Sequence, residues 1–182
     1  MKKLIFVLAA LLLFGSLAFA AETDQIKLEG PFLVTTCGQS PGAVMIKMSA
    51  MQVGVKAESN NQLSASDLEG TDAKTLIVTS GTSMKGMGAA GTNVDKEIER
   101  CTELIAAAKK AGIQVVGAHV EGMARRTDSS DQASIEAVMK DADIILVIDD
   151  SDSDGYFTKY AAEHEKPLLK VKDALAIGPA LK

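Results

Sequence analysis

The sequence has few of the residues that usually build metal and catalytic centres. It contains two histidines and two cysteines in 182 residues. His119 and His164 stand in no H-x-x-E-H or similar spacing, so a zinc site is not predicted, and no Ser-His-Asp motif is recognisable. We therefore expect a binding protein rather than an enzyme.

Positive charge is also scarce. The 19 lysines and arginines are outnumbered by 24 aspartates and glutamates, which gives a formal net charge of −5 at pH 7. Nucleic-acid-binding domains need a basic face that neutralises phosphates. The acidic balance therefore predicts no nucleic-acid partner.

Long apolar runs are absent after residue 20. Before that point, Lys2 and Lys3 precede an apolar stretch over residues 4–14, and residues 18–20 form an A-x-A cleavage pattern. This predicts a signal peptide over residues 1–20 and a single mature domain over residues 21–182, periplasmic or secreted; an uncleaved membrane anchor is the alternative. Cleavage would remove both lysines and take the net charge to −7.

Strand and helix patterns alternate along the mature chain. Apolar runs predict strands at residues 32–36, 76–78, 113–116, 144–148 and 167–171. Helices are predicted at residues 42–55, 94–111, 129–140, 155–165 and 173–181. Residues 56–73 are interpreted as a long connection, or as a short irregular strand followed by a loop. The alternation predicts an α/β fold, a three-layer αβα sandwich with a mostly parallel five-stranded sheet, flavodoxin-like or Rossmann-like.

Residues 80–93 are the most unusual segment, a predicted loop that contains four glycines and Lys85. It joins the carboxyl end of a strand to the amino end of a helix, where backbone N–H groups and the helix dipole favour an anion. A flexible surface loop without a ligand is the alternative. Residues 86–91 match G-x-G-x-x-G, but they do not follow the strand directly and no acidic residue stands at the expected spacing, so a dinucleotide is not favoured.

Two further segments are predicted at the same edge of the sheet. Ser40 and Gly42 begin a helix around Pro41, and Arg125 and Arg126 lie in the loop after the strand at residues 113–116. Guanidinium groups pair with carboxylates and phosphates, although a solvated basic pair is the alternative. The predicted ligand-binding residues are Cys37, Gly38, Ser40, Gly42, Ser80, Gly81, Thr82, Ser83, Lys85, Gly86, Arg125 and Arg126.

Residues 150–155 follow the pattern D-x-D-x-D-G, the first half of a calcium-binding loop. Asp150, Asp152 and Asp154 are the candidate metal ligands. The twelfth position of the motif holds Ala161 instead of a glutamate, so a closing ligand would have to come from elsewhere. A solvated acidic turn, in which Asp154 caps the next helix, is the alternative.

Cys37 is predicted just before a helix amino terminus, a position that lowers the pKa of a thiol and increases its reactivity. Cys101 is predicted on the apolar face of its helix, as a packing residue. Two cysteines in an exported protein suggest a disulfide. We nevertheless expect Cys37 at the edge of the sheet and Cys101 well along a helix, too far apart to pair.

Three methionines, Met45, Met48 and Met51, recur every third residue. Thioethers bind Cu(I), and exported copper proteins use such spacing. A helix must also bury one face, and that requirement predicts core packing for Val44, Met48, Met51 and Val55.

The run FLVTTCGQSPG over residues 32–42, followed by Ser-Gly-Thr over residues 80–82, resembles an uncharacterised family of small secreted bacterial α/β domains. The resemblance covers most of the mature chain and implies export and an α/β fold, with no activity attached. A looser similarity, in topology alone, is to the small sulfur-relay proteins.

Together these features predict an extracytoplasmic protein that binds a small anionic metabolite at the carboxyl edge of the sheet, in the service of a membrane transporter or a sensor. This function requires no cofactor. Two alternatives stay open. One is a thiol-dependent redox or sulfur-transfer protein that uses Cys37, and the other is an interaction domain that binds calcium through residues 150–155.

Overall fold

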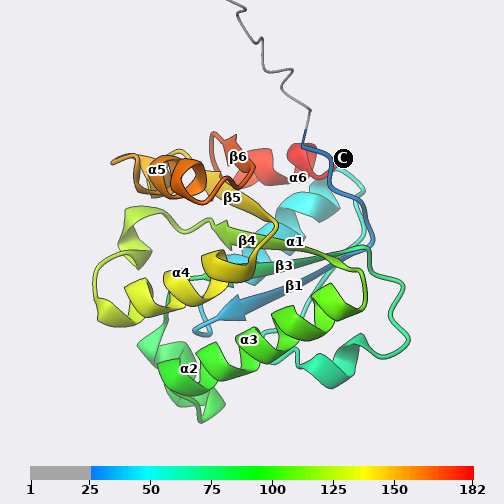
Figure 1. Cartoon of the computed structure of the whole chain (residues 1–182), viewed down its shortest axis with the longest axis horizontal. Coiled ribbons are helices and arrows are strands. Elements are labelled where there is room, and N and C mark those ends of the chain that lie inside the picture. The colour runs from blue at the N-terminus through cyan, green and yellow to red at the C-terminus, as the bar shows by residue number, and fades with distance from the viewer. Residues whose placement is uncertain (1–25) are drawn as a thin grey trace, which may run out of the picture.

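The computed structural model describes residues 26–182, which form one parallel sheet covered by helices on both faces (Figure 1). The strands are β1 (Phe32–Cys37), β2 (Ala57–Ser59), β3 (Thr75–Ser80), β4 (Gln114–His119), β5 (Ile144–Ile148) and β6 (Leu168–Val171). Their order in the sheet is β2-β1-β3-β4-β5-β6, and every neighbouring pair is parallel. This order contains the flavodoxin-like arrangement and confirms the predicted α/β class.

The helices form the two outer layers. They are α1 (Gly42–Gln52), α2 (Met84–Ala90), α3 (Val94–Lys110), α4 (Ser129–Asp141), α5 (Tyr156–Glu163) and α6 (Ile177–Ala180), with 3₁₀ segments η1 (Ala65–Leu68), η2 (Gly122–Arg125), η3 (Asp150–Asp152) and η4 (Ala174–Ala176). One apolar cluster joins α3, α4 and α5 to the sheet, and a second joins α1 and α6 to its other face. In Figure 1 the α3 and α4 layer lies toward the viewer, with α1 behind the sheet.

The sheet has six strands rather than the predicted five. The extra strand, β2, lies at one edge and has only three residues. A short strand was one of the two interpretations of residues 56–73. No apolar pattern marks it, because an edge strand of this length buries few side chains. The connection from β2 back to β3 is made by the short segment η1 instead of a full helix.

The long helix α3 follows the sequence prediction closely. Asn93 caps it by accepting the N–H of Lys96 at 3.0 Å. Lys109 and Lys110 stand in its last turn, where their positive charges interact favourably with the negative end of the helix dipole. Its buried face brings Cys101 against the end of β1. The predicted separation of the two cysteines is therefore wrong, because the Cys101 thiol lies 3.7 Å from the carbonyl oxygen of Thr36, the residue before Cys37.

The segment over residues 80–93 is not a loop, which corrects the prediction. It contains α2, which Ser83 caps by accepting the N–H of Gly86 at 3.1 Å. The helix ends at Gly91, whose φ of +67° is the left-handed conformation that glycine favours. A Cβ on Gly86 would stand 2.3 Å from the carbonyl oxygen of Gln39, so α2 packs directly on the loop after β1.

The predicted buried face of α1 is wrong. The helix turns Ala43, Ile46 and Ala50 toward the sheet. Met48 and Met51 are 59% and 62% exposed, and Val44 is exposed as well. Apolar residues occur on several sides of α1, so the pattern alone could not select the face that packs.

The predicted signal peptide over residues 1–20 lies outside the described residues. Within residues 26–182, no helix combines the length and the apolar composition needed to cross a membrane.

Candidate functional site

The carboxyl edge of the sheet brings together the ends of β1 and β3. Cys37 stands opposite Ser80 in the strand register, and the chain continues into an antiparallel bridge between Gln39 and Thr82. In doubly wound sheets a ligand crevice opens where consecutive connections leave to opposite faces, as they do here after β1 and β3. In this structure the two loops are joined by hydrogen bonds, and the crevice is closed.

Three internal carboxylates use the backbone N–H groups that we predicted would hold an anion. The pairs are Gly38 N–H with Glu97 Oε2 (3.2 Å), Gly42 N–H with Glu121 Oε1 (2.9 Å) and Thr82 N–H with Asp131 Oδ1 (2.8 Å). Each carboxylate therefore occupies a place where an external anion would have bound. This corrects the prediction of an anion cradle made by the loops after β1 and β3.

The three carboxylates are themselves held by further partners. Glu97 forms an ion pair with Arg100 at 2.8 Å, and its side chain is only 4% exposed. Burial would raise the pKa of Asp131, but hydrogen bonds from Thr127 and Thr82 outweigh that effect and lower the pKa. These three side chains belong to the internal hydrogen-bond network of the fold.

The predicted cationic side chains are either hydrogen-bonded to other groups of the protein or exposed to solvent. Arg125 donates to Glu121 at 3.1 Å and to the Thr82 carbonyl at 2.8 Å. Arg126 makes two hydrogen bonds to Asp154, at 2.8 and 3.0 Å, and its guanidinium also lies over an aromatic ring. Lys85 is exposed on α2. These cations do not converge on one ligand.

The candidate calcium ligands also have separate protein partners. Asp152 accepts from the backbone at the start of α5 and from Lys170, while Asp150 accepts the N–H of Met123. The Arg126 hydrogen bond lowers the pKa of Asp154 to about 2. Within residues 26–182 no group of three histidine, cysteine, aspartate or glutamate side chains is placed to hold a metal ion. The arrangement does not support the calcium hypothesis.

Ser80 and His119 form a hydrogen-bonded pair at the ends of β3 and β4. Ser80 Oγ lies 3.0 Å from His119 Nδ1, and His119 Nε2 lies 3.2 Å from the Gly122 carbonyl. Burial lowers the pKa of His119 to about 4. Nucleophile and base stand this close in hydrolases, but both side chains are fully buried. In this structure the pair is enclosed by protein and joins the ends of β3 and β4.

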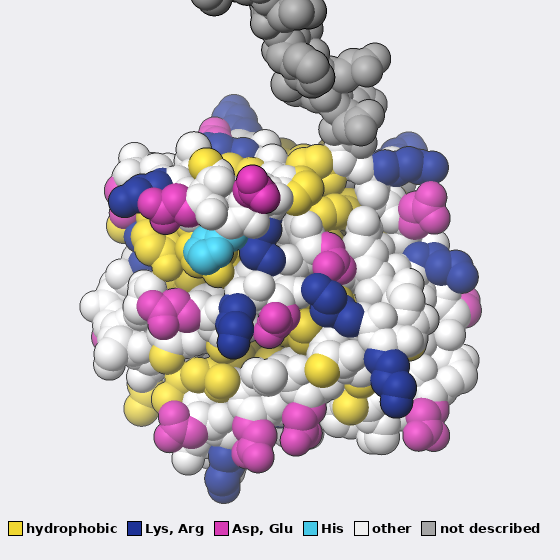
Figure 2. All heavy atoms as spheres, in the orientation of Figure 1, with side chains coloured by type: hydrophobic (Ala, Val, Ile, Leu, Met, Phe, Trp, Pro, Cys, Tyr) yellow, Lys and Arg dark blue, Asp and Glu magenta, His cyan; other side chains and the backbone are white. Residues whose placement is uncertain are grey.

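An apolar cavity of about 220 Å³ lies between α2 and the amino ends of α3 and α4. We call it the methionine cavity, and its lining residues are Met84, Met87, Gly88, Thr92, Asn93, Val94 and Ser130. Met87 is buried, whereas Met84 is 72% exposed and forms an outer wall. Figure 2 shows hydrophobic side chains at the surface in the region of α2 and α4, amid charges of both signs.

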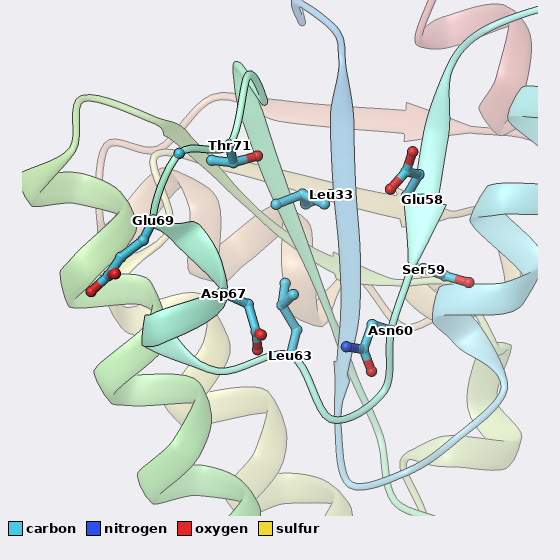
Figure 3. Close-up of a pocket in the computed structure, with 9 residues that line it drawn as sticks. Leu33, Glu58, Ser59, Asn60, Leu63, Asp67, Glu69 and Thr71 are labelled. Atoms are coloured by element: carbon cyan, nitrogen blue, oxygen red, sulfur yellow. The ribbon is translucent and has the colours of Figure 1, made fainter.

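A second hollow, of about 320 Å³, lies beside β2 (Figure 3). Leu33 and Leu63 lie near its centre, with Glu58 on the β2 side and Asp67 on the η1 side. It exists because η1 is too short to cover this part of the sheet. Its acidic side chains are exposed, and Asp67 already accepts from Ser64, so the hollow has no fixed polar group aimed at a ligand.

Comparison with protein-family models finds a match over residues 29–182. The chain belongs to the DUF6305 family, a domain of unknown function. The match covers almost all of the described DUF6305 fold, and no curated protein matches the chain.

Two solved structures resemble this DUF6305 domain distantly. One is a GDSL-like lipase from Bacteroides thetaiotaomicron, with 10% identity and a TM-score of 0.39 over 76% of this chain and 66% of that chain. The other is a putative acylhydrolase from Bacteroides fragilis, with 8% identity and a TM-score of 0.36 over 81% of this chain and 71% of that chain. These values are too low to transfer an activity.

The sequence placed the candidate site at the carboxyl edge of the DUF6305 sheet, which stays a prediction, and it did not identify the three carboxylates that accept N–H groups there. Glu97, Glu121 and Asp131 lie 59, 79 and 49 residues from the N–H groups that they accept. The one available signal was Glu97 itself, a charged residue beside the apolar stripe of its helix. The methionine cavity was missed because α2 was predicted as a loop.

Proposed function

We propose that this DUF6305 domain binds a small aliphatic monocarboxylate, an anion with an apolar chain, in the methionine cavity. The observation that carries the proposal is the cavity itself, at the carboxyl edge where ligands of α/β sheets bind. We infer from residues 1–20 that binding takes place outside the cytoplasm, and that the bound ligand is passed to a membrane transporter or a sensor.

The walls of the cavity fit the apolar part of such a ligand. Met84, Met87 and Val94 present aliphatic and thioether surface. Methionine side chains are flexible and polarizable, so they adapt to ligands of different shape. The volume corresponds to about seven water molecules at roughly 30 Å³ each, which suits a small ligand.

The polar end of the cavity fits the carboxylate. Thr92, Asn93 and Ser130 line it, and Asn93 is the cap of α3. The first N–H groups of a helix have no partner within the helix, and the dipole of a helix as long as the 17-residue α3 favours a negative charge there. The Asn93 side chain accepts the N–H of Lys96. The N–H groups of Val94 and Asp95, the two residues before Lys96, are left for a ligand.

Binding is favoured over catalysis because the nucleophile–base pair of this edge is sealed. Ser80 and His119 line none of the cavities described above. A ligand in the methionine cavity therefore meets methionines and helix N–H groups instead of a reactive pair.

The test is calorimetric titration with hexanoate, compared with hexanol and hexylamine. We expect hexanoate to bind and to raise the melting temperature, hexanol to bind more weakly, and hexylamine to bind least. Replacing Gly88 with leucine is expected to obstruct the cavity, because Gly88 lines it, and a Cβ at this position meets no atom within 4 Å. The matched control is Ala89→Leu, an exposed position on the same helix outside the cavity.

Three results would contradict the proposal. The first is equal binding of the acid, the alcohol and the amine, which would remove the role of the α3 amino end. The second is unchanged hexanoate binding by Gly88→Leu, which would place the ligand elsewhere. The third is absence of binding across aliphatic acids of two to eight carbons, which would reject the ligand class.

A further inference from the structure

The two cysteines of the described chain lie side by side in the core. Cys37 is the last residue of β1, and Cys101 lies on the buried face of α3. The Cys101 thiol donates to the carbonyl oxygen of Thr36, the residue before Cys37, at 3.7 Å, and both sulfurs belong to the same apolar cluster. Both side chains are at most 1% exposed, and both are free thiols in this structure.

The surroundings of the pair favour ionisation of one sulfur. The neighbouring Cys101 thiol lowers the pKa of Cys37, and the same neighbourhood raises the pKa of Cys101. The nearby Arg100 guanidinium also favours a Cys37 thiolate. A thiolate beside a thiol is the arrangement from which disulfide exchange proceeds.

We propose that Cys37 and Cys101 close into an intramolecular disulfide when the protein folds in contact with a small disulfide oxidant. The bond would tie β1 to α3 across one face of the sheet, in the layer that also contains α4 and α5. The proposal is independent of any ligand in the methionine cavity, because neither cysteine lines that cavity.

The exchange uses oxidised glutathione as the oxidant. The Cys37 thiolate attacks one sulfur of glutathione disulfide, forms a mixed disulfide and releases one glutathione thiolate. The Cys101 thiolate then attacks the Cys37 sulfur, forms the protein disulfide and releases the second glutathione. The two protein thiols lose two protons and two electrons, and glutathione disulfide gains both.

Burial decides when this exchange occurs. Both sulfurs are buried in the folded protein, so the bond forms late in folding, when α3 has brought Cys101 beside Cys37 but has not yet closed over the two sulfurs. For the same reason the finished disulfide resists reduction until the chain unfolds. Such behaviour is that of a structural disulfide and differs from that of a redox catalyst.

The test compares the full mature chain refolded with oxidised glutathione and with dithiothreitol. After denaturation, a maleimide should label no thiol in the oxidised sample and two in the reduced sample, and the oxidised mass should be lower by two hydrogen atoms. The disulfide closes a loop over residues 37–101, so the oxidised form should melt roughly 10 °C higher. Dithiothreitol should open the bond in urea and leave it intact in buffer.

For each of the variants Cys37→Ala and Cys101→Ala, the melting temperature after refolding with oxidised glutathione is compared with that after refolding with dithiothreitol. A packing defect caused by the substitution lowers both values equally and does not affect their difference. Each should melt at the same temperature in both. The proposal is overturned if the oxidised wild type folds with both thiols still labelled, or carries glutathione on a single cysteine. Rapid reduction of the native disulfide would overturn its structural role.

Discussion

Lowering the pH from 7 to 5 should reduce the free energy of unfolding by about 2 kcal/mol through His119 alone. The imidazole is fully buried, contacts Ser80 and the Gly122 carbonyl through its two nitrogens, and stacks on Phe157 at a centroid distance of 5.2 Å. Its pKa falls from 6.5 to about 4, chiefly because burial disfavours the charged ring. The folded protein therefore holds His119 neutral.

The sign follows from the two protonation states. The unfolded chain binds a proton at His119 as the pH falls below 6.5, whereas the folded chain does so only near pH 4. Low pH therefore favours the unfolded chain. The contribution is fully present above pH 6.5 and is lost as the pH falls toward 4, and the complete loss amounts to about 3 kcal/mol.

The buried or paired aspartates with lowered pKa values contribute outside this pH window. Asp131, Asp152 and Asp154 have lowered pKa values in the folded protein. Their stabilising contributions are fully present above the unfolded value of 3.8 and are lost only below it. Between pH 7 and 5 the pH dependence of stability is therefore assigned to His119.

The assay is urea denaturation at several pH values between 7 and 5. The wild type should lose about 2 kcal/mol, or roughly 4–8 °C in melting temperature. His119→Gln should be less stable at pH 7 and should show a nearly flat profile. The matched control is His164→Gln, at the exposed end of α5, which should keep the wild-type profile. A wild-type profile that is flat, or equally steep in His119→Gln, would refute the reasoning.

Two further predictions test the packing of the edge. Gly86→Ala should destabilise the fold by about 1–3 kcal/mol, because the added Cβ meets the Gln39 carbonyl. Gly88→Ala in the same helix should stabilise the fold by up to about 1 kcal/mol, because its Cβ meets no atom within 4 Å. Chemical denaturation of both variants measures the two changes. Glu97→Ala should lose about 3–5 kcal/mol, since it leaves a half-buried guanidinium without its partner. The comparison is Lys109→Ala, which removes an exposed ion pair and should lose less than about 1 kcal/mol. Equal losses in Glu97→Ala and Lys109→Ala would contradict the role given to burial.

The parts of the fold that the sequence predicted are those with a local signal. The strand at residues 144–148 is an uninterrupted β-branched and aliphatic run, and β5 is Ile144–Ile148. The helix predicted at residues 94–111 is observed as Val94–Lys110, because its cap and its apolar stripe are both written in the sequence.

Three of the features that the sequence did not predict have a common physical cause. The packing face of α1, the pairing of Cys37 with Cys101, and the partners of the Gly38 and Thr82 N–H groups all depend on contacts between segments far apart in the chain. Helix α2 was missed for a different reason. Its glycines predicted a loop, but Gly86 is required there by the close approach to Gln39, so a residue selected for packing was interpreted as flexible.

The sheet narrows toward both of its outer strands. β2 has three residues and β6 has four, and exposed charges stand on each, Glu58 on the first and Lys170 on the second. A long apolar edge is a template on which another molecule can add a strand, the first step of fibrous aggregation. Here each edge offers few backbone groups and requires an incoming strand to pass a charged side chain. Copies of this domain are therefore protected against joining edge to edge at high concentration.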